Sequence, residues 1–430
     1  MKRFLFILAV LLAVPSLARA ADGGTVSEPA AYRRIQEIVR VLQGNLAPEK
    51  VFAPAFLSAV PPAQLDAIAR QLVAANGALL SAENVREDGK GGTTFDIVYA
   101  HGRGPAQIHL GPAPRFLVTG FNIGAVLPAN DTPQKILEDI EALPGVTGVG
   151  IYELDKAGPV PILLRDADRQ MAIGSAFKLY VLSALAREIA AGKRRWSDVV
   201  PLGARSLPGG TMQDWPQQAP VTLQTLATMM ISISDNTATD TLMRLLGREA
   251  IAAEVVASGH SAPSRMLPML TTIEAFALKA GDPARAAEYA RADDKAQFAM
   301  LDRWAPVLTR ENVDPGRLAT PQPLAIDSIE WFASAHDIAR ILARLRDGGD
   351  PAVLQILSVN PSIPEQEATY WDYVGYKGGS ESGVLNLSWL LKDKRGRWLA
   401  IAATWNNAEK NVDDTKLELL ALRLMRMFHP

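Results

Sequence analysis

A serine and a lysine three residues apart are the first residues that could carry out chemistry together. Ser175 and Lys178 begin a segment, residues 175–190, whose apolar residues recur at helical spacing. On a helix this spacing places the hydroxyl and the amine on one face, about one turn apart. The amine could then take the hydroxyl proton, and the positive helix end would favour a neutral amine and an alkoxide. The alternative is a helix cap followed by a surface lysine.

A second polar group interrupts an apolar helical stretch in the middle of the chain. Ser234, Asp235 and Asn236 break the helical pattern of residues 223–246 and add a hydroxyl and an amide. An ordinary polar turn would explain the same residues.

The third group lies near the end of the chain. Lys377 ends a predicted strand and precedes Gly378, Gly379 and Ser380, so a ligand could approach the backbone there. A glycine bulge in an edge strand is the alternative. The three groups stand in the order S-x-x-K, S-D-N, K-G-G, with 59 residues from the first serine to the second and 143 from there to the lysine. Chance does not readily produce this ordered triple.

Strands are predicted on both sides of a helical centre, and they must position these groups. Residues 146–153 and 161–165 have the pattern of paired strands and precede the first group. Residues 373–377, 383–391 and 398–405 are predicted strands that surround the third group, and an amphipathic helix over 413–428 follows.

The N-terminal part has its own pattern. Two helices are predicted at residues 29–46 and 61–73, followed by glycine-punctuated strands at 93–99, 106–110 and 116–121. This order indicates a small α+β domain of about 100 residues. A linker at residues 128–133 would then cap a new helix at Thr132, with the domain boundary near residue 130.

The first 20 residues have the features of a secretory signal peptide. Lys2 and Arg3 precede an apolar run over residues 4–14, and Ala18 and Ala20 form a small-x-small cleavage site. The run is shorter than the roughly 20 residues that span a bilayer, and no later stretch is long and apolar enough. The sequence therefore predicts a secreted or periplasmic protein without a membrane span in its mature form.

Composition excludes several classes of function. The chain has 430 residues and a formal net charge of -2, which argues against general nucleic-acid binding. It has no cysteine, so disulfides and thiol nucleophiles are excluded. Its five histidines are scattered without ligand spacing, so neither a metal nor another cofactor is expected. A small molecule is the expected partner, and the oligomeric state stays open.

The ordered triple resembles the serine β-lactamase and penicillin-binding-protein superfamily, and its S-D-N form with the 59-residue gap resembles class A β-lactamases. The resemblance covers about residues 135–430. Three motifs, at residues 172–178, 330–333 and 377–384, are more narrowly similar to a two-domain subgroup known from clavulanate biosynthesis. This resemblance to the two-domain subgroup implies a small α+β domain of cystatin/NTF2-like, cyclase/isomerase-like fold at residues 25–130. A β-lactamase/transpeptidase-like domain would follow, with an antiparallel sheet flanked by helices and an all-helical subdomain.

The resemblance also implies a role for each matching residue. Ser175 would be the acylated nucleophile, Lys178 its general base, and Ser234 the donor of a proton to the leaving nitrogen. The substrate would be bound by Asn236, Lys377 and the segment of Gly379 and Ser380. Asn236 would bind the substrate amide and Lys377 its carboxylate, while the backbone N–H groups of Ser175 and Ser380 would form an oxyanion hole.

Two departures from the family pattern concern binding and deacylation. Gly378 stands where the family usually has threonine or serine, which would shift carboxylate recognition to Ser380 or Ser382. Ala305 stands where class A enzymes carry the glutamate that activates the deacylating water, and Glu274 and Glu311 are alternative candidates for that role.

The sequence thus predicts a serine hydrolase that opens β-lactam amides through an acyl-enzyme, with slow deacylation if Ala305 replaces the glutamate. An esterase or a D-alanyl-D-alanine peptidase on the same fold, or a non-catalytic penicillin-binding protein of the cell envelope, remains the alternative. A β-lactam or an ester is accordingly the expected small-molecule substrate.

Overall fold

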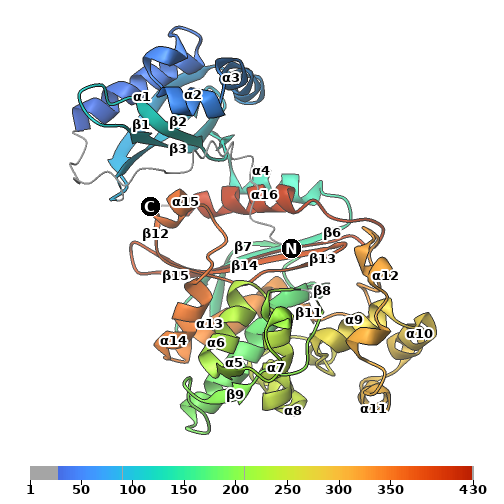
Figure 1. The fold of residues 1–430 in the computed structure, drawn as a ribbon. Coiled ribbons are helices and arrows are strands. Elements are labelled where there is room, and N and C mark those ends of the chain that lie inside the picture. Colours follow the sequence, from blue (N-terminus) through green and yellow to red (C-terminus); the bar gives the residue numbers. More distant parts are fainter. Residues whose placement is uncertain (1–27, 90, 208, 429–430) are drawn as a thin grey trace. The chain divides into compact units, whose positions relative to one another are not determined.

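The computed structural model describes residues 28–89, 91–207 and 209–428 (Figure 1). The predicted signal peptide lies outside these residues. The described chain divides into two compact units. The smaller unit runs to Ile136 and includes Leu422–Met427, and the larger unit holds Leu137–Ala421.

The smaller unit packs helices on one face of an antiparallel sheet. The sheet has the order β1–β2–β3–β4, and a short strand β5 also pairs with β3. Its core joins Ile35 and Ile38 of the first helix to Phe95, Ile97 and Ile108 of the central strands. The elements are α1 (Glu28–Leu42), η1 (Pro48–Lys50), α2 (Pro54–Ala59), α3 (Pro62–Asn76), β1 (Leu79–Glu87), β2 (Gly92–Tyr99), β3 (Gly102–Leu110), β4 (Val118–Ile123) and β5 (Leu127–Pro128).

Two features of this unit differ from the sequence prediction. Strand β1 was not predicted, because only Leu79 and Ala82 of its nine residues are buried and its register shifts after Glu83. Polar residues therefore obscure the alternation that identifies a strand. Strand β4 begins at Val118 rather than at Phe116, because Phe116 has a φ of 45° and cannot continue an extended strand.

The larger unit is built on a six-stranded antiparallel sheet. Its order is β12–β14–β15–β6–β7, and β13 extends β12 along the side of β14. Helices cover both faces in Figure 1, so β14 and β15 are buried along almost their whole length. The strands are β6 (Val146–Leu154), β7 (Pro159–Arg165), β12 (Trp371–Tyr376), β13 (Gly379–Glu381), β14 (Val384–Asp393) and β15 (Trp398–Asn406).

Helix α13 (Ala335–Asp347) packs on one face of this sheet, and α16 (Asp414–Arg426) lies along the other face in Figure 1. Helix α4 (Pro133–Glu141) begins at the predicted linker, where Thr132 Oγ1 accepts a hydrogen bond from Lys135 N (3.1 Å). Two-residue strands β8 (Met171–Ala172) and β11 (Phe332–Ala333) pair with each other beside the sheet.

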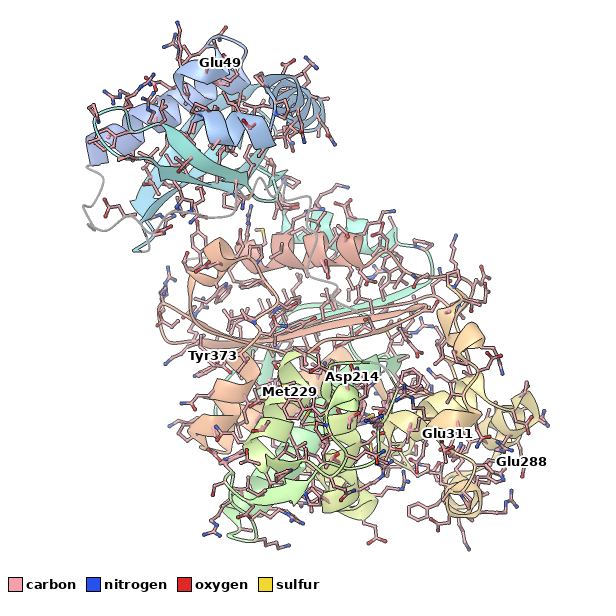
Figure 2. The ribbon with its side chains drawn as sticks, in the orientation of Figure 1. Glu49, Asp214, Met229, Glu288, Glu311 and Tyr373 are labelled. Carbon is pink, nitrogen blue, oxygen red and sulfur yellow. The ribbon has the colours of Figure 1, made fainter. Side chains whose placement is uncertain are left out.

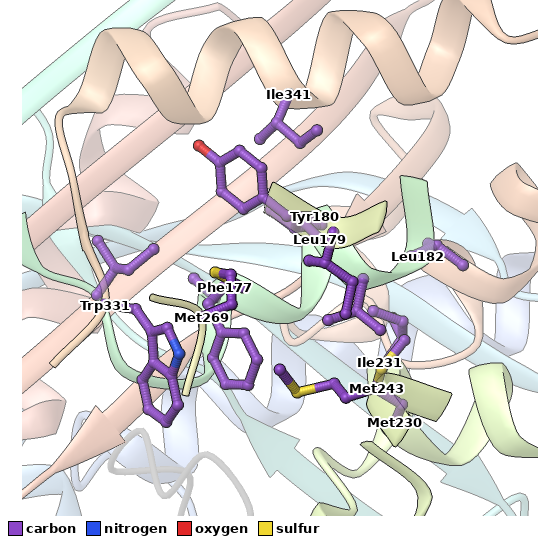
Figure 3. Packing of buried hydrophobic residues seen from close by; sticks show 14 of the residues in the cluster. Phe177, Leu179, Tyr180, Leu182, Met230, Ile231, Met243, Met269, Trp331 and Ile341 are labelled. Atoms are coloured by element: carbon purple, nitrogen blue, oxygen red, sulfur yellow. The ribbon is translucent and has the colours of Figure 1, made fainter. Parts of the chain in front are cut away.

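Most of the remaining helices form the all-helical part of the larger unit. Its interior is apolar and includes Phe177, Met230 and Trp331 (Figure 3). The elements of the larger unit not yet named are α5 (Lys178–Ala190), β9 (Val199–Pro201), η3 (Met212–Asp214), β10 (Pro220–Thr222), α6 (Leu223–Ser232), α7 (Asn236–Leu246), α8 (Arg248–Ala257), η4 (Pro263–Arg265), α9 (Thr272–Ala280), α10 (Pro283–Arg291), α11 (Asp294–Trp304), η5 (Arg310–Asn312), α12 (Pro315–Ala319), α14 (Pro351–Ser358) and α15 (Glu365–Ala368).

The mixed α+β architecture, with an antiparallel sheet flanked by helices and a helical subdomain, confirms the predicted fold class of the larger unit. One boundary beside the site was wrong. The helix predicted from Ser175 begins at Lys178, and Ser175 lies in a preceding 3₁₀ turn, η2 (Gly174–Phe177). Gly174 has a φ of 48°, so the chain enters this turn through the left-handed region rather than directly into an α-helix.

Candidate active site

Lys178 is the first residue of α5, and its side chain is completely buried. Its Nζ atom lies 2.8 Å from the backbone oxygen of Ser234, 3.0 Å from Ser234 Oγ and 2.8 Å from Asn236 Oδ1. All three partners are uncharged. Burial lowers the pKa of Lys178 to about 7, although the carboxylates of Asp240 and Asp235 act in the opposite direction. At neutral pH, Lys178 is therefore a neutral amine in a large fraction of the molecules, and a neutral amine can accept a proton.

Ser234 lies in the tight turn between α6 and α7. Its φ of 58° places it in the left-handed region, which is uncommon for any residue other than glycine. Lys377 Nζ lies 3.1 Å from Ser234 Oγ, so two amines share this hydroxyl. A hydroxyl can accept a hydrogen bond from one amine and donate its own hydrogen to the other when that amine is neutral. The Ser234 hydroxyl is therefore placed to pass a proton to or from Lys178.

Asp235 fixes the geometry of this turn. Its buried carboxylate accepts hydrogen bonds from the backbone N–H groups of Ala238 (2.9 Å), Thr211 (2.6 Å) and Met212 (2.7 Å). The first of these bonds caps α7, and the other two attach the neighbouring loop. In the sequence, Asp235 stands out only as the middle residue of the S-D-N motif. Its position directly before a helical stretch is the signal that predicts a cap.

Lys377 follows the last residue of β12, and its side chain is also buried. Its backbone N–H donates to Ser388 O of β14 (3.0 Å), and its Nζ donates to the backbone oxygen of Gly378 as well as to Ser234. Burial, reinforced by the charge of Lys178, lowers the pKa of Lys377 well below its usual value. A carboxylate bound beside this amine would oppose that shift and favour the ammonium form.

Gly379 allows strand β13 to lie directly against the turn that carries Ser175. A methyl group at Gly379 would stand 2.1 Å from Ile173 O and 2.4 Å from Ser175 N, so no larger residue fits without displacing the backbone. The backbone nitrogen of Ser380 lies beside Gly174 in the same way, 3.2 Å from where a methyl group would be. The two N–H groups predicted to form an oxyanion hole thus belong to two segments that are in contact.

Ser175 is partly exposed, whereas its neighbours Gly174 and Ala176 are buried. Within the described chain its hydroxyl makes no hydrogen bond, so the alternative of a helix-capping serine finds no support. The alternative of a surface lysine fails as well, because Lys178 is buried. Lys178 Nζ is bonded to Ser234 and Asn236 rather than to Ser175. The structure therefore brings Lys178, Ser234, Asn236 and Lys377 into one hydrogen-bonded group, with the Ser175 turn and β13 packed together.

Comparison with known protein families gives one match for this chain. Residues 132–358, which are more than half of it, match the family described as the beta-lactamase enzyme family. The chain belongs to the beta-lactamase enzyme family. Serine hydrolases of the β-lactamase and penicillin-binding-protein type are therefore its relatives. The search of curated proteins gave no match.

The chain is also similar to solved structures. A beta-lactamase from Sphaerobacter thermophilus is 21% identical, with 69% of this chain and 98% of that chain covered and a TM-score of 0.47. A beta-lactamase from Chitinophaga pinensis is 16% identical, covering 70% and 98% of the two chains with a TM-score of 0.46. A structure described as PBP-A is 15% identical, covering 69% and 95% with a TM-score of 0.46.

The departure from the family pattern at Gly378 has a local cause. A methyl group at Gly378 would stand 2.0 Å from the hydroxyl oxygen of Tyr376 and 2.9 Å from Asn386 O. The Tyr376 ring packs 5.0 Å from that of Trp389, centroid to centroid, and burial raises the pKa of its hydroxyl. A threonine or serine at position 378 would collide with this ring. The tyrosine two residues earlier thus explains why glycine is required here.

The carboxylates considered for water activation are occupied or remote. Glu274 forms a capping box with Thr271 at the start of α9, and its Oε1 accepts from Arg248 Nη2 (2.8 Å). Glu311 is exposed in η5, and Figure 2 shows it on the α9–α12 side, away from Met229 on α6. Ala305 is exposed at the end of α11. The structure therefore gives Glu274 a structural role and joins neither Glu311 nor Ala305 to the buried amines.

Asp240 influences the charge of Lys178, a role that the sequence does not predict. This completely buried carboxylate accepts hydrogen bonds from Thr272 N (2.7 Å), Thr272 Oγ1 (2.8 Å), Ser206 Oγ (2.9 Å) and Ile273 N (3.1 Å). Burial raises its own pKa, while its charge raises that of Lys178. An aspartate on the same helix as Asn236, five residues after Asp235, is too common a pattern to be predicted as part of the site.

Two negative findings apply to the described residues alone. They contain no group of three or more histidine, aspartate or glutamate side chains that could hold a metal ion. None of their helices combines the length and the apolar character that crossing a membrane requires.

Proposed function

We propose that the protein is a serine hydrolase that opens β-lactam amides through an acyl-enzyme on Ser175. The observation that carries the proposal is the pair of buried amines, Lys178 and Lys377, on the single hydroxyl of Ser234. This arrangement supplies a neutral base and a proton relay next to the turn that carries a partly exposed serine. Membership of the beta-lactamase enzyme family supports the same reaction type.

In the acylation step, Lys178 takes the proton of Ser175 Oγ, and the oxygen attacks the carbonyl carbon of the substrate. Negative charge develops on the carbonyl oxygen, where the N–H groups of Ser175 and Ser380 would stabilise it. The carbon–nitrogen bond then breaks, and the leaving nitrogen takes a proton from Ser234. The Lys178 ammonium, which is hydrogen-bonded to Ser234 Oγ, returns a proton to that hydroxyl. Proton uptake and release therefore balance within the group.

Substrate binding would use the remaining residues of the site. Lys377 would bind a carboxylate of the substrate, and Asn236 its side-chain amide. With no hydroxyl at Gly378, the hydroxyl of Ser380 or Ser382 is proposed to complete carboxylate recognition. Small β-lactams fit this set of groups. The predicted signal peptide would place the enzyme in the periplasm or outside the cell, where such an activity gives antibiotic resistance.

The test is turnover of a chromogenic cephalosporin by the wild type and by Ser234→Ala. Loss of the proton relay should reduce acylation at least about a hundredfold. Ser232→Ala is the matched control, because that hydroxyl bonds only its own helix, at Thr228 O (2.6 Å), and should retain wild-type turnover. If the wild type neither turns over nor binds the cephalosporin covalently but cleaves an acyl ester or a D-alanyl-D-alanine peptide, the β-lactamase proposal fails and one of its alternatives takes its place.

A further inference from the structure

Three charged side chains form a second buried cluster in the larger unit. Lys279 of α9 has its Nζ 2.7 Å from Glu330 Oε1, and it also donates to Glu381 Oε1 of β13. The side chains of Lys279 and Glu330 are 2% and 1% exposed, whereas that of Glu381 is 20% exposed. Glu381 is thus the member of the cluster that water can reach.

Glu381 belongs to the same short strand that packs on the turn of Ser175. Gly379 and Glu381 are two residues apart on β13, so their side-chain positions share one face, about 7 Å apart along the strand. At Gly379 that face lies directly on the backbone of Ser175, since a methyl group there would stand 2.4 Å from Ser175 N. Ser380, between the two, carries the N–H proposed for the oxyanion hole.

Glu330 attaches the other side of the same turn. It directly precedes Trp331, whose ring stacks on Phe177 with 3.9 Å between centroids (Figure 3). Trp331 O accepts a hydrogen bond from Ile173 N (3.0 Å), and Glu330 Oε2 accepts from Trp331 N (3.0 Å). Two segments that carry members of the cluster therefore contact the Ser175 turn: β13 through Gly379, and the segment of Glu330 through Trp331.

The cluster has two carboxylates but one lysine, so one of the carboxylates lacks a cation of its own and binds a proton more readily. Burial raises the pKa of Glu381 to about 8, with Lys279 opposing the shift and the neighbouring Glu330 reinforcing it. These two side chains, from α9 and from the segment before β11, are the charged groups that act on Glu381. Lys178 and Lys377 are the other titratable groups beside the Ser175 turn. A carboxylate that titrates close to neutral pH is suited to general base catalysis.

We infer that Glu381 is the general base that activates the water for hydrolysis of the acyl-enzyme. The inference rests on the proposed function. It gives Glu381 the role that a glutamate at position 305 would have in class A enzymes. Glu381 takes a proton from water as the water oxygen attacks the ester carbon. The bond from that carbon to Ser175 Oγ then breaks, and Glu381 returns the proton to Oγ. The products are a free serine and an opened acid. Lys279 and Glu330 are positioning residues that hold the carboxylate.

The test measures acylation and deacylation separately by intact-mass spectrometry after rapid mixing with benzylpenicillin. In Glu381→Gln, acylation should stay within about threefold of the wild type, while the acyl-enzyme should persist at least about a hundredfold longer. Glu311→Gln is the matched control, because Glu311 is an exposed carboxylate on the helical side of the unit and should leave both rates unchanged.

The pH profile separates a base from a structural role. The wild-type deacylation rate should rise with pH as Glu381, whose pKa is raised by burial, loses its proton, and in Glu381→Gln this rise should disappear. If that variant does not fold, Glu381→Asp serves instead, because it keeps a carboxylate on a shorter arm. It should shift the midpoint of the profile and slow deacylation more than acylation.

The outcomes that overturn the inference are distinct from failure of the proposed function. An acyl-enzyme of Glu381→Gln that hydrolyses at the wild-type rate rules Glu381 out. Acylation and deacylation that fall by the same factor indicate a displaced β13, and also reject the base. Absence of any adduct on both the wild type and Glu381→Gln would instead refute the acyl-enzyme itself.

Discussion

Two regions of the larger unit each contain buried lysines, and their partners differ. Among the described residues, Lys178 and Lys377 donate hydrogen bonds only to neutral oxygens, and burial lowers both pKa values. Lys279 is equally buried, but it contacts Glu330 and Glu381. Burial alone would lower the pKa of Lys279, and the two carboxylates outweigh it and raise the pKa. The charge of the partner, rather than the depth of burial, thus decides whether a buried lysine is a base or a fixed cation.

The difference also predicts what each lysine contributes to stability. Removing one member of a buried ion pair leaves the other charge uncompensated, which is strongly destabilising. A buried amine without a carboxylate partner leaves only polar groups behind when it is removed. The amine region should therefore affect catalysis more than folding, and the ion-paired region should affect folding more.

The largest expected effect is on the stability of Lys279→Met. This change leaves the buried carboxylate of Glu330 without its cation, so the free energy of unfolding should fall by about 3 to 5 kcal/mol. Chemical denaturation measures it. Lys295→Met is the control, since Lys295 is exposed on α11 and its loss should change stability by less than about 0.5 kcal/mol. Equal effects of the two substitutions would contradict the cost expected for an unpaired buried carboxylate.

The next effect is on acylation in Lys178→Met. Loss of the general base should slow acylation by a β-lactam at least about a hundredfold. The same variant should lose less free energy of unfolding than Lys279→Met, because no opposite charge is left unpaired. Stopped-flow kinetics and denaturation together test this. A fast-acylating variant, or one less stable than Lys279→Met, contradicts the prediction.

The pH dependence of acylation sharpens the comparison further. Lys178 acts as a base only when neutral, and its pKa is about 7. Acylation should therefore fall about tenfold for each pH unit below 7 and level off above it. Rate constants measured between pH 5 and pH 9 show the midpoint. A profile that is flat across this range would mean that a different group takes the proton.

The smallest expected effect is that of a chelator. The proposed mechanism uses only proton transfers between side chains, so EDTA should leave cephalosporin turnover unchanged. A loss of turnover that added zinc restores would reject the serine mechanism.

Much of the fold was predictable because the sequence carries periodic patterns. The strands that surround the site and the two helical segments predicted at residues 175–190 and 223–246 follow apolar periodicity, and their predicted bounds lie within a few residues of the observed ones. The order of the three motifs identified the family for the same reason: it depends on local sequence. Helix α5 was predicted to begin at Ser175 because periodicity does not distinguish a 3₁₀ turn from the first turn of an α-helix.

The parts that could not be predicted depend on contacts between distant segments. Asp240 acts on Lys178 through space, and Glu381 lies 102 residues after Lys279 in the chain. A single glutamate on a short strand carries no signal of its partners. The sequence likewise does not explain why glycine occupies position 378. The structure shows that a side chain there would collide with the Tyr376 hydroxyl. Roles for the site residues, and the likeness of the smaller unit to a cyclase/isomerase domain, remain predictions.

The most direct measurement is the mass of the protein and of its peptides after mixing with a penicillin. The account predicts an increase equal to the mass of one penicillin, located on the peptide that contains Ser175. Ser175→Ala should show no increase while keeping the wild-type fold, because the Ser175 hydroxyl has no hydrogen bond to lose within the described chain. An adduct on another residue, or one that persists in Ser175→Ala, would contradict the account.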